Sequence, residues 1–126
     1  MLDRHDSSAI VAVRDLARAR TFYEDTLGLR LVEGGGDAPL VFKTGATHLV
    51  VYPSEFAGSN QANAVVWGVG EAIEDIAADL AAKGVTFERY ELDVATYADG
   101  VHRMGDFRMV WFKDPDGNIL HLNSAD

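Results

Sequence analysis

The sequence predicts an α+β protein built from two βαβββ modules that repeat one another. Two stretches match at one constant offset, with Val13 over Val69, Asp15 over Glu71 and Gly28 over Gly84. In each stretch an apolar run is followed by residues of helical period, and short strand-like segments between turn residues come next. We therefore predict one domain over residues 1–126, with module one at about 6–53, a linker at about 54–63 and module two at about 64–123.

The first module is expected to open with a strand at 8–13 and a helix that begins after Asp15. A carboxylate at this position suits the free N–H groups and the dipole of a helix N-terminus. The helix is expected to end at Gly28, since glycine accepts the left-handed backbone conformation of a helix C-terminus. Three strands are then predicted at 29–32, 40–43 and 48–52, separated by turns at 34–37 and 44–45.

The second module follows the same plan, with a strand at 64–69 and a helix between Glu71 and Gly84. Strands are predicted at 85–91, 108–112 and 118–122, the last two joined by the turn Asp114-Pro115-Asp116-Gly117. The segment 92–106 is expected to be a long irregular loop, and it carries Tyr97, His102 and Met104. Long loops in compact domains often cover functional sites.

Composition removes several classes of function. Twenty acidic against 11 basic residues give a net charge of −9, which opposes binding to nucleic acids and to anionic membranes. The chain has no cysteine, so disulfides, thiolate metal sites and cysteine nucleophiles are excluded. No apolar run approaches the length of a membrane span, and the N-terminus lacks the pattern of a signal peptide. We expect a soluble cytoplasmic protein.

Three stretches resemble the vicinal oxygen chelate superfamily, which includes glyoxalase I, bleomycin-resistance proteins, fosfomycin-resistance enzymes and extradiol dioxygenases. They are 13–29, its repeat at 69–84, and Phe112-Lys113-Asp114-Pro115-Asp116-Gly117-Asn118. The resemblance implies that the two modules place their sheets side by side as an open eight-stranded cup with the helices outside. In metal-dependent members, four positions on the inner face of the cup hold a divalent metal.

These four positions carry few metal donors in this chain. The family's pattern places them at Ser8, Ala64, His121 and either Val50 or Tyr52. Since a catalytic metal site usually needs three protein ligands, we expect neither a metal nor another cofactor. The alternative is a substitute metal site in which His48 and His102 join His121.

The inner face of the cup would mix apolar and polar side chains, as ligand pockets do. The predicted ligand-binding residues are Ser8, Ile10, His48, Val50, Tyr52, Val66, His102, Trp111 and His121. His121 is the best candidate for a catalytic group, although an ordinary hydrogen-bonded strand histidine is an open alternative. The sequence leaves open whether Trp111 faces the pocket or the core, whereas strand alternation predicts that Trp67 packs under the second helix.

The favoured function is that of a metal-free protein that binds an aromatic or cationic compound, similar to the bleomycin-resistance branch and so connected with antibiotic resistance. One alternative is a lyase, isomerase or dioxygenase resembling glyoxalase I, either metal-dependent or working through histidine alone. Another is a subunit whose cup binds a partner chain. Sheet edges must be covered, so we expect a homodimer, as in the family.

Overall fold

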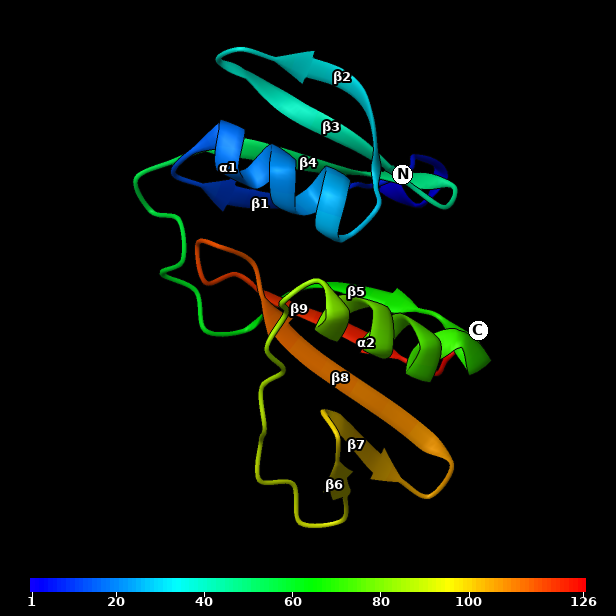
Figure 1. Ribbon diagram of the computed structural model, residues 1–126. Coiled ribbons are helices and arrows are strands. Elements are labelled where there is room, and N and C mark those ends of the chain that lie inside the picture. Colours follow the sequence, from blue (N-terminus) through cyan, green and yellow to red (C-terminus); the bar gives the residue numbers. More distant parts are fainter. The chain divides into compact units, whose positions relative to one another are not determined.

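The computed structural model describes residues 1–126 and divides into two compact units (Figure 1). Unit 1 comprises Met1–Gln61 and Pro115–Asn118, and unit 2 comprises Ala62–Asp114 and Ile119–Asp126. Each unit combines one mixed β-sheet with helical segments. The predicted α+β class is therefore confirmed.

Unit 1 contains a four-stranded sheet in the order β1-β4-β3-β2. Its strands are β1 (Ala9–Val13), β2 (Arg30–Gly35), β3 (Ala38–Thr44) and β4 (Thr47–Pro53), and β1 runs parallel to β4 while the other pairs are antiparallel. Helix α1 (Leu16–Thr21) continues as the π-helical segment η2 (Phe22–Thr26), and a short 3-10 helix, η1 (Leu2–Arg4), precedes β1. This is the βαβββ arrangement that the sequence predicts.

Local chemistry explains where α1 begins and where the helical segment ends. The side chain of Asp15 accepts a hydrogen bond from the backbone N–H of Arg18 at 3.1 Å, as an N-terminal cap does. After η2, Gly28 adopts a φ of 71°, in the left-handed region. The helical segment buries Ala19 and Tyr23, and the Tyr23 ring packs against Phe42 of β3. One face of the sheet of unit 1 therefore forms its core.

Unit 2 repeats this topology and adds one strand. Its strands are β5 (Asn63–Gly68), β6 (Thr96–Ala98), β7 (Val101–Met104), β8 (Phe107–Lys113) and β9 (Ile119–Asn123), in the order β5-β9-β8-β7-β6. Strand β5 runs parallel to β9, as β1 does to β4, and the other pairs are antiparallel. The 3-10 helix η3 (Gly70–Ala72) leads into α2 (Ile73–Ala82), which buries Ile73, Ala77 and Leu80.

Two predictions for unit 2 are wrong. The segment 85–91 is not a strand, because only Phe87 bridges to Phe112 of β8. Part of the predicted irregular loop instead forms the hairpin β6–β7, whose turn has Asp99 and Gly100 at positive φ, as two-residue hairpin turns require. The hairpin pairs with the first half of β8 and leaves only the second half for residues 87–88. The chain thus has nine strands in place of the predicted eight.

The turn 115–118 belongs to unit 1 and is bonded to it at several points. Asp116 accepts hydrogen bonds from the backbone of Arg14 and the guanidinium of Arg18, and Asn118 donates to the carbonyl oxygen of Ala12 at 2.8 Å. The most specific motif in the sequence is therefore an anchor of the fold.

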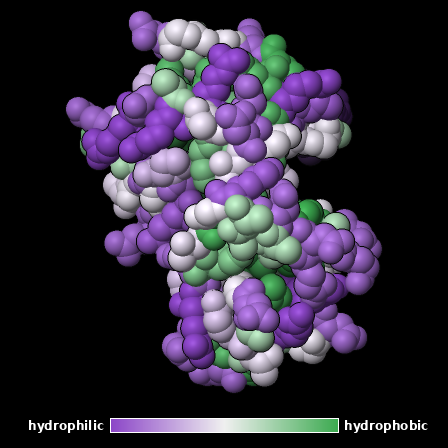
Figure 2. Space-filling model, viewed as in Figure 1, coloured by the Kyte–Doolittle hydropathy of each residue, from purple (hydrophilic) through white to green (hydrophobic).

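The surface drawn in Figure 2 is mostly hydrophilic, with small green patches of hydrophobic residues among the purple ones. No helix is both long enough and apolar enough to cross a membrane.

Candidate ligand-binding site

The sheet of unit 2 has one face covered by α2 and one face free of helices. Arg103 of β7 and Arg108 of β8 stand opposite each other in the sheet, and both form ion pairs with Glu74 of α2. Their face is therefore the helix-covered one. Because side chains alternate along a strand, His102 and Met109 point to the other side. We call this side the open face of unit 2.

Pairing across the strands places several residues singled out from the sequence on this open face. Trp111 stands opposite His121, and His121 stands opposite Val66 on β5. On the hairpin, Tyr97 stands opposite His102. The register thus answers the question that the sequence left open: Trp111 lies on the open face with His121 and not under α2.

The rings on the open face pack directly against one another. The rings of Trp111 and His121 are stacked, with centroids 4.6 Å apart and planes at 21°. His102 meets Trp111 edge to face at 5.0 Å and Tyr97 at 4.8 Å. Tyr90, from the irregular segment before β6, packs against Trp111 at 5.2 Å and is stacked with His102 at 6.3 Å. We call these five residues the aromatic cluster.

His121 is held in one tautomer. Its Nδ1 atom lies 3.1 Å from the carbonyl oxygen of Val110, which accepts only, so Nδ1 carries the proton. Its Nε2 atom then accepts from the side-chain amide of Asn123 at 3.3 Å, and that amide's oxygen accepts from Ala125. Burial lowers the pKa of His121, and the bond to Val110 opposes this effect only in part. His121 is therefore a neutral imidazole at pH 7, with its Nε2 atom as the basic one.

His102 has a different hydrogen-bonding state. It is the most buried of the four histidines, with 1% of its surface exposed. Its Nε2 atom accepts the backbone N–H of Tyr90 at 3.0 Å, which leaves the proton of a neutral ring on Nδ1. Nδ1 is buried and has no hydrogen-bond partner in the protein. The open face therefore contains one unpaired donor.

The predicted residues of unit 1 share a face as well. Ile10 stands opposite Val50, and His48, Val50 and Tyr52 alternate along β4 with the buried Leu49 and Val51. Ile10 and Tyr52 are exposed, at 60% and 36%. Ile10, His48, Val50 and Tyr52 therefore lie on the side of the sheet away from its core.

Two further predicted residues, Ser8 and Val66, are exposed. Ser8 precedes β1, and Val66 is 58% exposed beside His121. Tyr90 belongs to the cluster but was not singled out from the sequence, because residues 85–91 are predicted to be an ordinary strand. The only available signal was an aromatic residue two positions before the loop that carries Tyr97 and His102.

The residues at the family's metal positions do not fit a metal. Val50 and Ala64 offer no donor atom, and Ser8 offers only a hydroxyl on an exposed residue. His121 uses both ring nitrogens in hydrogen bonds within unit 2. Neither unit contains a group of three or more histidine, aspartate or glutamate side chains placed to hold an ion.

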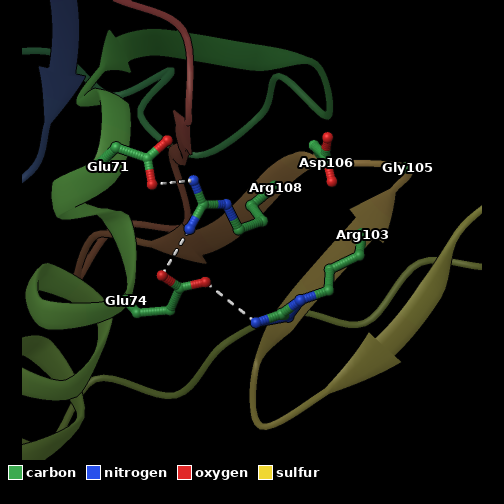
Figure 3. A pocket seen from close by; sticks show the side chains of 6 residues that line it. All are labelled: Glu71, Glu74, Arg103, Gly105, Asp106 and Arg108. Carbon is green, nitrogen blue, oxygen red and sulfur yellow. Dashed lines mark hydrogen bonds and ion pairs between the residues drawn. The ribbon is translucent and has the colours of Figure 1, made fainter.

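A hollow of about 400 Å³ lies on the helix-covered side of unit 2. Figure 3 shows Glu74 of α2 between the guanidinium groups of Arg103 and Arg108, with Glu71 on the far side of Arg108. The nitrogen–oxygen distances are 3.0 Å for Arg103 and 2.6 Å for Arg108 to Glu74, and 3.1 Å for Arg108 to Glu71. Both arginines are already paired, and their ion pairs hold α2 on the sheet. This hollow is therefore a poorer candidate for a ligand site than the open face.

Comparison with known proteins agrees with the architecture. A sequence profile of the Glyoxalase/Bleomycin resistance protein/Dioxygenase superfamily matches residues 7–122. The chain belongs to this superfamily. The resemblance noted in the sequence is thus confirmed, and no curated protein matches the chain significantly in sequence.

Solved structures with the same fold include proteins of different activities. The antibiotic binding protein TnmS3 from Streptomyces sp. CB03234 is 23% identical, with a TM-score of 0.67 over 97% of this chain and 96% of that one. The fosfomycin resistance protein FosX from Listeria monocytogenes, in a complex with Mn(II) and sulfate, is 14% identical, with a TM-score of 0.72 over 97% and 90%. Lactoylglutathione lyase from Agrobacterium tumefaciens is 17% identical, with a TM-score of 0.67 over 94% and 92%. At these identities the likeness concerns the superfamily's fold.

Proposed function

We propose that this superfamily member binds a small aromatic compound on the open face of unit 2, without a metal. The observation that carries the proposal is the stack of His121 on Trp111, extended by His102 and Tyr90. Trp111 and His121 are each only 8% exposed, so an aromatic ligand would join this stack by displacing a ring that now packs on it, such as Tyr90. Ring pairs attract one another beyond the area that they bury. Polar groups among these rings supply orientation.

The proposal that no metal takes part rests on the residues themselves. Three of the four family positions lack a histidine or carboxylate, and His121 donates its Nδ1 proton to a backbone carbonyl and accepts an amide at Nε2. A ligand would therefore be held by stacking and hydrogen bonds.

Sequestration of an antibiotic is the role that we propose for this binding. It is supported by the superfamily's inclusion of bleomycin-resistance proteins and by the shared fold with the antibiotic binding protein TnmS3. The net charge of −9 favours a ligand that carries a positive charge beside its ring. We further propose that the protein acts in the cytoplasm as a homodimer, because the two sheets have edge strands that a second copy would cover. Sedimentation at micromolar concentration tests the dimer, and a stable monomer would contradict it.

Proton transfer by His121 is a second candidate function. Its Nδ1–H is fixed on Val110, so the Nε2 lone pair is the one available to a substrate that displaces Asn123. A neutral histidine at pH 7 is able to act as a general base. If a turnover assay with a bound compound shows product that disappears in His121→Gln, the protein is an enzyme and the binding role becomes the first step of a reaction.

Two tryptophans on opposite faces of the same sheet provide a matched test of binding. Trp111 lies in the aromatic cluster, whereas Trp67 stands opposite Leu122, on the helix-covered side. Equilibrium dialysis against a panel of cationic and neutral aromatic compounds should give saturable binding to the wild type and to Trp67→Leu. Binding to Trp111→Leu should weaken at least about tenfold, as expected for the loss of a central aromatic anchor. No saturable binding to the wild type, or equal loss in both variants, would refute the proposal.

A further inference from the structure

The unpaired Nδ1–H of His102 is the starting point of a more specific inference about the ligand. Buried polar groups in proteins are almost always hydrogen-bonded, so an unpaired donor in a nearly inaccessible ring calls for an explanation. The groups packed around His102 are the rings of Tyr90, Tyr97 and Trp111, and none of them gives Nδ1 an acceptor. The guanidinium of Arg89 lies over the Tyr97 ring, 4.8 Å from its centroid.

The opposite nitrogen of His102 explains why the ring keeps this orientation. Nε2 accepts the backbone N–H of Tyr90, so a flipped ring or the other neutral tautomer would lose that bond. The proton is therefore kept on Nδ1, where the protein does not use it. A donor fixed in this way is preorganised for an acceptor that comes from outside the chain.

Tyr90 packs on the His102 ring that carries this donor. It lies in a segment without regular secondary structure, residues 88–95, which we call the strap. Two backbone hydrogen bonds join the strap to the sheet: the N–H of Glu88 donates to the carbonyl of Trp111 at 2.8 Å, and the N–H of Tyr90 donates to His102. The side chains of Glu88 and Arg89 add an ion pair with Lys113 and a contact over the Tyr97 ring. The ring of Tyr90 contacts both Trp111 and His102, which is the contact that a bound aromatic compound would make.

We propose that the ligand is a planar aromatic ketone or quinone whose carbonyl oxygen accepts the Nδ1–H of His102, and whose ring takes the place of Tyr90 on Trp111. This inference rests on the proposed function, and it adds the chemical class of the ligand and the residue that selects it. A site with a buried donor discriminates strongly against an analogue that lacks the acceptor, because the donor then stays unpaired.

Two probes that differ only at the acceptor test the inference: 9-fluorenone, which has a carbonyl on its central ring, and fluorene, which has a methylene there. In equilibrium dialysis, the wild type should bind 9-fluorenone about tenfold more tightly than fluorene, as one hydrogen bond to a buried donor would give. Equal affinity for the two probes would overturn the inference and leave the proposed function standing. Failure of both probes and of the wider aromatic panel would overturn the proposed function itself.

Variants separate the role of His102 from a structural one. His102→Gln can keep an oxygen acceptor for the N–H of Tyr90 while it removes the ring Nδ1–H. This variant should bind 9-fluorenone and fluorene with about equal affinity, and its affinity for fluorene should equal that of the wild type. His102→Phe, which keeps the ring contacts without either nitrogen, should give the same loss of preference. A preference that persists in a folded variant would contradict the assignment of His102.

Removal of the Tyr90 ring tests whether it occupies the ligand's place. Tyr90→Ala should bind both probes more tightly than the wild type, since no ring has to be displaced. Tyr97→Ala is the control, because Tyr97 packs on His102 from the hairpin and not from the strap. Weaker binding of both probes to Tyr90→Ala would show that Tyr90 supports the ligand, and this result would overturn the displacement.

Discussion

The guanidinium of Arg18 lies 2.8 Å from the carboxylate of Asp116, which is almost wholly buried although Arg18 is half exposed. The same carboxylate oxygen accepts the backbone N–H of Arg14. The two interactions bind the beginning of α1 to the turn 115–118 within unit 1. A turn motif notable in the sequence for its specificity is thus an electrostatic and hydrogen-bonded clamp.

The clamp predicts a stability effect. Asp116→Ala should lower the free energy of unfolding by about 1–3 kcal/mol, because it leaves a backbone N–H and a guanidinium without their acceptor. Urea denaturation followed by circular dichroism measures the change. The control is Asp37→Ala, an exposed acid in the β2–β3 turn, which should change stability by less than about 0.5 kcal/mol. Equal effects of the two substitutions would contradict the clamp.

Close backbone approach at Gly58 predicts a second stability effect. A Cβ atom at this position would stand 2.0 Å from the carbonyl oxygen of Asp116, and the φ of 75° is itself unfavourable for other residues. Gly58→Ala should therefore cost more than Gly36→Ala, where φ is 60° but no atom lies within 4 Å. We expect about 1 kcal/mol for Gly36→Ala, from backbone strain alone, and a clearly larger loss for Gly58→Ala. Thermal unfolding of both variants checks the order, and the reverse order would be inconsistent with this contact.

The pKa of His121 predicts how stability changes between neutral and mildly acidic pH. Burial lowers this pKa in the folded state, so the unfolded state takes up a proton first as the pH falls. The free energy of unfolding should therefore keep its neutral-pH value above about pH 6.5. It should decline as the pH falls below that value, until the folded-state pKa is reached. Urea unfolding at several pH values between about 7.5 and 5 should show a smaller decline in His121→Gln than in the wild type. An equal decline would mean that His121 does not contribute to this pH dependence.

The ion pairs of Glu74 predict a separate effect at lower pH. The hydrogen bond from Arg108 lowers the pKa of Glu74, with smaller contributions from the charges of Arg108 and Arg103. This interaction stabilises the folded state at neutral pH, and the stabilisation is lost as the pH falls through the lowered pKa, below about 4.5. Arg108→Gln should bring the pKa of Glu74 back toward its ordinary value, as a carboxyl titration by NMR would show. Arg103→Gln should move it less, and a larger shift from Arg103→Gln would contradict the ranking.

Much of unit 1 and part of unit 2 were predictable from the sequence because their signals are local. Strand alternation placed Val50 and Tyr52 on one side of their strand, and the acid at Asp15 marked the start of α1. Such signals need only the neighbouring residues, and they persist in the folded protein. The common face of Val66 and His121 came instead from the positions that the family resemblance implies.

The parts that were not predicted depend on competition between segments. Residues 85–91 have strand-like composition, but the hairpin β6–β7 takes the first half of the β8 edge, so only Phe87 pairs. The side of Trp111 followed from the register of β8 against β9, which no local pattern specifies. The contact of Tyr90 with His102 likewise depends on the path of the strap, which follows from the pairing of the hairpin with β8.

The position of the hairpin β6–β7 at the end of its sheet has a consequence for how this scaffold accommodates change. The hairpin contributes Tyr97 and His102 to the aromatic cluster, it pairs with the rest of the sheet only through β8, and its first strand, β6, has no counterpart in unit 1. The open-face residues Tyr97 and His102 can be exchanged without altering the parallel pairing of β5 with β9 or the ion pair of Arg103 with Glu74 of α2. The framework shared by the two units can thus stay constant while the open-face residues of the hairpin change. The hairpin is therefore the part of the protein where substitutions would most readily alter which compound it binds.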